Sequence, residues 1–140
     1  MTHYLDASVL VPILVPEPTS PDVDRFLSQH VASLVVSDFA AAEVASALSR
    51  LVRTGLLDSA EALVSLANFD SWRAGRTDEC DLVPADARIA GVFVRRFELK
   101  LRTPDALHLA MCRRLALRLV TFDARLAAAA GALGIETSRP

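Results

Sequence analysis

Cysteine is scarce in this 140-residue sequence, which contains only Cys80 and Cys112. Their separation matches no metal-binding spacing, and two cysteines are too few for a disulfide framework. The scarcity excludes a small disulfide-stapled domain and a cysteine-ligated zinc module. Because it suits a reducing compartment, we expect a cytoplasmic protein.

Long uninterrupted apolar runs are also missing. The longest apolar stretch near the start, VLVPILVP, contains Pro12 and Pro16 and follows no basic segment. It therefore lacks the features of a secretory signal peptide and of a membrane span. We expect a soluble, unprocessed chain with no membrane partner.

Lysine is nearly absent, since the 15 basic residues are 14 arginines and one lysine. Residues 1–87 carry 5 basic and 13 acidic side chains, whereas residues 88–118 carry 8 basic and 2 acidic ones. A guanidinium group can bind phosphate with two hydrogen bonds, so the basic stretch predicts either a polyanion-binding surface or a solvated helix surface. The candidate phosphate contacts are Arg95, Arg96, Arg113 and Arg114.

The length and hydrophobicity of the chain predict one domain. A chain of this size can bury a sizeable core, and 52% of its residues are hydrophobic, which excludes a disordered polymer. We find no repeat, linker or low-complexity tract. Residues 1–140 are therefore expected to form a single domain.

Short β-rich runs alternate with helical patterns along the sequence. The spacing of Ile89, Phe93 and Phe97, for example, is typical of one face of a helix. Strands that alternate with helices predict an α/β fold with a parallel sheet that is covered on both faces. The expected strands cover residues 3–5, 33–37, 80–83, 118–122 and, near the end, 134–137.

Capping residues mark several helix boundaries. Ser37 can cap a helix that begins at Asp38, and Gly55 can end it in a left-handed conformation. Asp58 resembles the first residue of a capping box for the next helix. Residues 38–73 are therefore expected to form a helical hairpin.

A further helix is predicted from the segment RTPDALHLAMCRRLAL. Thr103 is its expected N-cap and Pro104 its first helical residue, which places Asp105 in the first turn. The segment is apolar on nearly all sides, so we expect a buried helix. His108, three residues after Asp105, is either a core histidine or a neighbour of a metal ligand.

Four carboxylates are expected at one edge of the sheet. In open parallel sheets, ligands bind outside the carboxyl ends of the strands. Asp6 and Asp123 follow strands directly, Glu43 lies in the helix after strand 33–37, and Asp105 opens the buried helix. Each carboxylate could alone be a helix cap or a surface group.

The neighbours of Glu43 favour a functional role over a surface role. Ala40 and Ala47 flank it on the helix face, so this face is free of bulk and can approach other backbone closely. A solvated glutamate needs no such neighbours. Glu43 is therefore expected to face the other carboxylates.

Carboxylates that lie close together repel one another unless a cation is bound among them. Ligand sets made only of oxygen favour Mg²⁺ or Mn²⁺ over zinc. Because Mg²⁺ commonly contacts phosphate oxygens, an acidic cage beside an arginine-rich stretch predicts metal-assisted hydrolysis of nucleic acid. No covalent nucleophile is evident.

The segments YLDASVLV, AAEVASAL, TPDALHLA and LVTFDARLAAAAGALGI resemble, in order and spacing, the acidic motifs of PIN-domain proteins, specifically the VapC toxins of VapBC toxin-antitoxin systems. The resemblance spans nearly the whole chain. It implies a mainly parallel five-stranded sheet in a three-layer α/β/α sandwich. It also implies a Mg²⁺- or Mn²⁺-dependent endoribonuclease that hydrolyses RNA phosphodiester bonds.

The resemblance assigns the candidate site as well. It implies that Asp6 and Asp105 are the principal metal ligands and that Glu43 and Asp123 complete the cage directly or through water. Ser8 and Thr121 match supporting hydroxyl positions, although turn and strand-end hydrogen bonds explain Ser8 equally well. The implied partners are an RNA substrate, a cognate VapB-like antitoxin and a second copy of the chain in a homodimer.

Two alternatives remain open at this stage. An aspartate-based phosphotransfer or phosphatase domain would also place Asp6 at a strand end, but it needs a second aspartate where Ser8 stands or a lysine near the last strand. A non-catalytic binding module would use the apolar residues of hairpin 38–73 for docking. DNA is an alternative substrate, since no residue is assigned to a 2′-hydroxyl.

Overall fold

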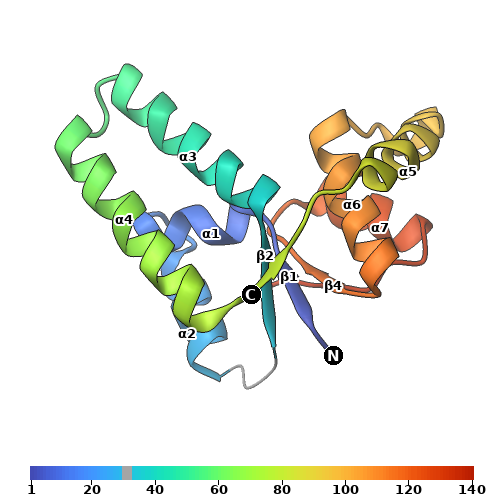
Figure 1. Ribbon diagram of the computed structural model, residues 1–140, viewed down its shortest axis with the longest axis horizontal. Helices are drawn as coiled ribbons and strands as arrows, with labels where there is room; N and C mark the ends of the chain where they lie inside the picture. Colours follow the sequence, from blue (N-terminus) through green and yellow to red (C-terminus); the bar gives the residue numbers. More distant parts are fainter. Residues whose placement is uncertain (30–32) are drawn as a thin grey trace.

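The computed structural model describes residues 1–29 and 33–140 and contains a five-stranded parallel sheet in the order β3-β2-β1-β4-β5 (Figure 1). This arrangement confirms the predicted α/β fold. The strands are β1 (His3–Leu5), β2 (Leu34–Ser37), β3 (Asp78–Cys80), β4 (Arg118–Val120) and β5 (Thr137–Ser138).

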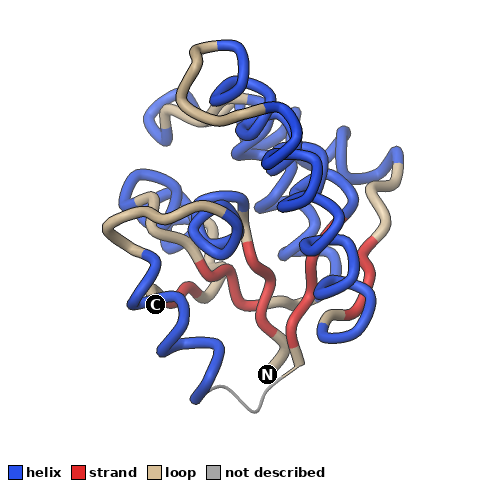
Figure 2. The backbone as a smooth tube through the Cα atoms, turned by 90° about the vertical axis from the view of Figure 1, so that its left-hand side faces the viewer, coloured by secondary structure: helices blue, strands red, loops and turns tan. Residues whose placement is uncertain are grey.

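Helices cover both faces of the sheet, which confirms the three-layer α/β/α sandwich (Figures 1 and 2). One face carries α1 (Ala7–Leu14), α2 (Ser20–Gln29), α3 (Asp38–Arg53) and α4 (Ser59–Arg76). The other face carries α5 (Pro84–Val94), the 3₁₀ helix η1 (Phe97–Leu99), α6 (Thr103–Leu115) and α7 (Ala124–Ala132).

Alternation along the central strands divides the core into two halves. Tyr4, Val35 and Leu119 pack into the cluster formed with α5, α6 and α7. Their neighbours Leu5, Val36 and Val120 pack into the cluster formed with α1 to α4. Successive side chains of a strand point to opposite faces, so a sheet covered on both sides needs apolar residues at every central position.

The predicted helical hairpin is confirmed. The Ser37 hydroxyl accepts a hydrogen bond from the Ala40 amide (2.9 Å) at the start of α3, and the Asp58 carboxylate accepts one from the Ala60 amide (3.0 Å) at the start of α4. Gly55 has φ = +75°, which is the left-handed conformation expected at the end of α3.

The prediction of Thr103 as the cap of α6 is wrong by one position. Arg102 is the N-cap, and Thr103 is the first helical residue. Sequence patterns commonly misplace a helix end by one residue, because several residues near an end can adopt either conformation. Asp105 still lies in the first turn of the helix.

Three other predictions in this half of the chain are wrong. The fifth strand covers Thr137–Ser138 instead of residues 134–137, because Gly134 (φ = +72°) and Ile135 still close the end of α7 through the hydrogen bond from the Ile135 amide to the Ala130 carbonyl (2.9 Å). The third strand covers Asp78–Cys80 instead of residues 80–83, because an edge strand does not need the apolar residues on which the prediction relied. Phe97 does not continue the apolar face of α5, which ends at Val94. Phe97 lies in η1 and its side chain is 83% exposed.

Among the helices that the structure describes, none combines the length and the apolar character needed to cross a membrane.

A buried ion pair joins α5 to α6. The fully buried Asp86 carboxylate accepts hydrogen bonds from Nε (2.7 Å) and Nη2 (2.9 Å) of Arg114 and from the Val83 amide (2.9 Å). Burial alone would raise the pKa of Asp86, but the Arg114 and Val83 hydrogen bonds lower the pKa below its ordinary value. The ionised pair therefore stabilises the fold.

We expect Arg114→Met to lower the free energy of unfolding by about 2–4 kcal/mol at neutral pH, since it leaves a buried carboxylate without its cation. The folded-state pKa of Asp86 is depressed, so the pair stabilises the protein above the ordinary aspartate pKa. That contribution disappears as the pH falls through the depressed value. The difference between variant and wild type, measured by urea unfolding, should therefore narrow in acid.

Arg95→Met is the matched control, because the Arg95 side chain is exposed and forms no hydrogen bond or ion pair within residues 1–29 and 33–140. Equal unfolding free energies for the two variants would show that the Asp86 pair contributes nothing.

Candidate active site

Asp6 lies where the direction of strand connection changes. The chain leaves β1 at Asp6 and continues through α1 and α2 to β2, which pairs with one edge of β1. The opposite edge of β1 pairs with β4, so the strand order reverses between β1 and β4. The Asp6 amide donates to the Val120 carbonyl (3.3 Å), so the carboxylate sits at the boundary between β1 and β4. This switch point is the common ligand-binding position in parallel sheets.

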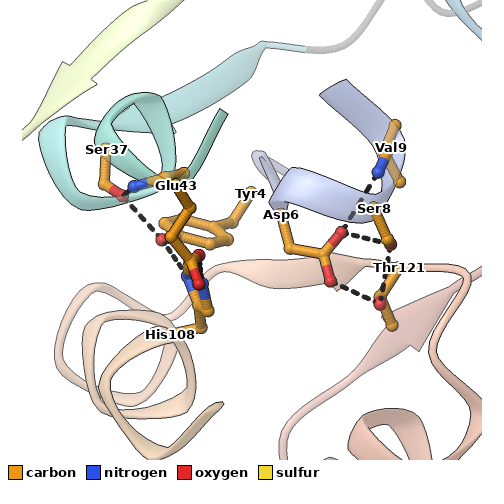
Figure 3. Close-up of polar contacts among 9 residues, drawn as sticks. Tyr4, Asp6, Ser8, Val9, Ser37, Glu43, His108 and Thr121 are labelled. Carbon is orange, nitrogen blue, oxygen red and sulfur yellow. Dashed lines mark hydrogen bonds and ion pairs between the residues drawn. The ribbon is translucent and has the colours of Figure 1, made fainter. Parts of the chain in front are cut away.

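Three groups hold the carboxylate of Asp6, a residue that is only 4% exposed (Figure 3). Its Oδ1 accepts hydrogen bonds from the Ser8 hydroxyl (2.6 Å) and the Val9 amide (3.3 Å), and its Oδ2 accepts one from the Thr121 hydroxyl (2.5 Å). Burial raises the pKa of Asp6, although these hydrogen bonds and the nearby His108 act in the opposite direction. The ionised carboxylate is therefore held at an electrostatic cost.

Ser8 and Thr121 also connect the first and last parts of the site. The Ser8 hydroxyl accepts a hydrogen bond from the Phe122 amide (3.0 Å), and the Thr121 hydroxyl accepts one from the Asp123 amide (3.0 Å). The structure thus places both predicted supporting hydroxyls in direct contact with Asp6. Through Thr121, they link Asp6 to the segment that carries Asp123.

Glu43 is held by a buried chain of polar groups (Figure 3). Its Oε1 contacts Nε2 of His108, and Nδ1 of His108 forms a hydrogen bond with the Tyr4 hydroxyl (2.6 Å). The Tyr4 hydroxyl is also hydrogen-bonded to the Ser37 hydroxyl (2.7 Å), which accepts from the Ala40 amide. Tyr4, Ser37 and His108 are all buried, so this chain fixes Glu43 between α3 and α6.

Sequence reasoning left the role of His108 open and did not single out Tyr4. The position of His108 one helical turn after Asp105 placed it on the same side of α6. Tyr4 gave no separate signal, because an aromatic residue in a buried strand is ordinary core.

Asp105 and Asp123 line a common cavity of about 240 Å³. Asp105 is half-buried in the first turn of α6, and its Oδ2 accepts a hydrogen bond from the Arg102 amide (3.3 Å). Asp123 is exposed, and its Oδ1 caps α7 by accepting from the Arg125 (2.9 Å) and Leu126 (3.1 Å) amides. Both residues therefore have a structural role in addition to facing the cavity.

The donor chemistry of the four carboxylates fits a hard divalent cation. Glu43, Asp105 and Asp123 each commit one oxygen to the protein, and within the described residues the second oxygen has no hydrogen-bond partner. Oxygen ligands of this kind suit Mg²⁺ or Mn²⁺.

The carboxylates do not form a closed set of ligands on their own. No group of three or more His, Cys, Asp or Glu side chains in the described part of the chain is spaced to hold a metal ion. The structure therefore brings the four residues to one edge of the sheet in two subsets. Asp6 and Glu43 are buried or half-buried among their partners, and Asp105 and Asp123 face the cavity.

The predicted phosphate-binding arginines lie away from the cavity. Arg113 and Arg114 are in the last turn of α6, about 12 Å along the helix axis from Asp105. Arg114 is paired with Asp86, and Arg113 contacts the Leu133 carbonyl.

The other two predicted arginines follow α5. Arg96 is paired with Glu98 (2.8 Å), and the exposed Arg95 forms no side-chain hydrogen bond or ion pair in the described ranges. The basic residues that line the cavity are instead Lys100, Arg102 and Arg125. These three residues were not predicted from the sequence, although Lys100 and Arg102 lie just before the TPDALHLA motif and Arg125 follows Asp123 by two positions.

Comparison with known proteins agrees with this geometry. The family model described as PIN domain matches residues 3–132. The chain is 34% identical to a protein named Ribonuclease VapC46 from Mycobacterium tuberculosis, over 98% of this chain and 96% of the relative.

Solved structures of similar fold include VapC20 from Mycobacterium tuberculosis, which is described as a sarcin-ricin loop cleaving toxin. The TM-score is 0.73 at 16% sequence identity, and the match covers 91% of this chain and 94% of that chain. Another is DNA-bound VapBC from Salmonella typhimurium, with a TM-score of 0.71, 15% identity and coverage of 99% and 98%. The order of the acidic motifs, the sheet topology and these matches agree, and the chain belongs to the PIN-domain family, in its VapC group.

Proposed function

We propose that this protein is the toxin of a VapBC-type toxin-antitoxin system and acts as a metal-dependent endoribonuclease on RNA phosphodiester bonds. The observation that carries the proposal is the position of Asp6, Glu43, Asp105 and Asp123 at one edge of a PIN-family sheet. Three of these residues have an oxygen that the described protein groups do not engage. Membership of the PIN family removes the basis for the phosphotransfer alternative.

The four carboxylates would hold Mg²⁺ or Mn²⁺, which when bound supplies positive charge that polarises the scissile phosphodiester and activates water. The remaining work belongs to the chain itself. Ser8 and Thr121 orient the Asp6 carboxylate, and His108 orients Glu43. Because both carboxylates are fixed by buried groups, they lose little conformational freedom on binding a cation.

The proposed partners are a cognate VapB-like antitoxin and a second copy of this chain. The antitoxin is supported by the VapBC structure of similar fold. Exposed apolar side chains lie on the α3–α4 hairpin at Leu56, Leu63 and Val64, and a cavity of about 500 Å³ lies between Leu14 and Val64. This exposed apolar surface suits a protein partner. The proposed function therefore includes both docking of a partner on the hairpin and catalysis at the carboxylates.

We expect Asp6→Asn or Asp105→Asn to reduce cleavage of RNA by roughly 100-fold or more, because each removes a negatively charged metal ligand. Cleavage should be measured by gel analysis of cellular RNA with Mg²⁺ or Mn²⁺ present. Asp24→Asn is the control, since Asp24 is exposed on α2 and its side chain forms no hydrogen bond or ion pair in the described structure. Full activity after complete removal of divalent ions would refute the metal-dependent mechanism.

We expect Asp6→Asn to raise the melting temperature of the metal-free protein by about 2–4 °C, because it removes a charge that burial disfavours. The raised pKa of Asp6 means that this cost is present at neutral pH and disappears as the pH falls below that pKa. Added Mn²⁺ should stabilise the wild type more than the variant. If Mn²⁺ stabilised both proteins equally, Asp6 would not be a ligand.

We expect His108→Phe to weaken Mn²⁺ binding by about 10- to 100-fold, because Glu43 loses the group that orients it. His108→Gln should recover part of the affinity, since its amide can donate to Glu43. Calorimetry and the electron paramagnetic resonance spectrum of bound Mn²⁺ measure this effect apart from activity. A purely structural histidine would change the melting temperature and leave the Mn²⁺ affinity of both variants at the wild-type value.

A further inference from the structure

We propose that Lys100, Arg102 and Arg125 form a binding site for the phosphate backbone of RNA, directly beside the catalytic carboxylates. The proposal rests on the ribonuclease function proposed above and assigns the surface that holds the substrate. It replaces the sequence-based expectation that the arginines at the ends of α5 and α6 are the main contacts.

The three cations belong to the same cavity as two of the four carboxylates. Lys100 and Arg102 come from the segment between η1 and α6, and Arg125 comes from the first turn of α7. Asp105 and Asp123 are the acidic residues of the lining, so the cavity carries three positive and two negative side chains. Cations bound at the carboxylates would make its net charge more positive.

The three cationic side chains are available to a ligand. All three residues are exposed, and none forms an ion pair or side-chain hydrogen bond with the part of the chain that the structure describes. Of the four arginines predicted from the sequence, Arg96, Arg113 and Arg114 are engaged by groups of the protein itself. Arg95 is unpaired, but it is not among the residues that line the cavity. A guanidinium already bound to a carboxylate has fewer donors to offer to phosphate.

The backbone of Lys100 lies in the left-handed region. Lys100 has φ = +54° and ψ = +36°, a conformation that residues other than glycine seldom adopt. Glycine or asparagine would adopt this turn more easily. The turn itself therefore does not favour lysine, and it sets Lys100 in the lining of the cavity.

The shape of the basic surface suits a polymer. A second cavity, of about 340 Å³, also contains Lys100 and Arg125 in its lining and continues along η1 and α7 past Ala128. Lys100 and Arg125 therefore line both cavities, and Glu98, the acidic residue of the second lining, is paired with Arg96. An extended chain of phosphates can occupy such a groove at successive positions, with the scissile phosphate at Asp105 and Asp123.

The test is the salt dependence of RNA binding by the triple variant Lys100→Asn, Arg102→Ala and Arg125→Ala. Asparagine is used at position 100 because it tolerates the left-handed backbone. The matched control is Arg50→Ala, Arg53→Ala and Arg76→Ala, which removes the same charge from exposed positions on α3 and α4. The probe is fluorescein-labelled single-stranded RNA of mixed sequence, and Asp6→Asn is present throughout to prevent cleavage.

Each lost phosphate contact should reduce the magnitude of the slope of log affinity against log salt concentration by about 0.7 for a single strand. The triple variant at Lys100, Arg102 and Arg125, called the cavity variant, should therefore show a slope reduced in magnitude by about 2, whereas the slope of the control should hardly change. With Asp6 restored, the cavity variant should show a raised KM for RNA and a kcat within a few-fold of wild type. Wild-type melting temperatures would confirm that both variants fold.

If RNA is cleaved but the slope of the cavity variant equals that of the control, the inference is overturned and the proposed function stands. The same conclusion follows if Arg95→Ala, Arg96→Ala and Arg113→Ala lower the slope and the cavity variant does not. If the wild-type protein neither binds nor cleaves RNA with Mn²⁺ present, the proposed function and this inference both fail.

Discussion

The site depends on parallel pairing of β1 with β2 on one side and β4 on the other. This pairing aligns the carboxyl ends of three strands, so residues 6, 37 and 121 meet at one edge although they are far apart in the sequence. A direct hydrogen bond from Thr121 to Asp6 and one between the Tyr4 and Ser37 hydroxyls fix the alignment. A shift in strand register would separate these groups, because it would exchange the faces of the sheet.

The electrostatics of this edge explain its combination of burial and charge. Asp6 is buried at a cost, as the direction of its pKa shift shows, whereas Asp86 is buried beside Arg114 and is stabilised. The pKa of a buried carboxylate is thus lowered where an arginine contacts it, at Asp86, and raised where burial dominates, at Asp6. The difference fits a structural role for Asp86 and a ligand-binding role for Asp6.

Much of the fold followed from the sequence, because the central strands and capped helices have strong local patterns. Strand 3–5, the cap at Ser37 and the left-handed Gly55 are set by nearby residues. The edge strand β3 and the exposed Phe97 were mispredicted, since neither is governed by apolar periodicity. The four carboxylates were predicted from their place in the α/β order. The pairing of Glu43 with His108 and the cations of the cavity could not be predicted in this way, because they depend on contacts across the sheet.

The most direct test of the central claim is a crystal structure of the protein soaked with Mn²⁺, in which anomalous scattering locates the ion. The account predicts Mn²⁺ bound by oxygens of Asp6 and Asp105, with Glu43 and Asp123 bound directly or through water. Anomalous density only at other surfaces, with the four carboxylates unliganded at saturating Mn²⁺, would contradict it.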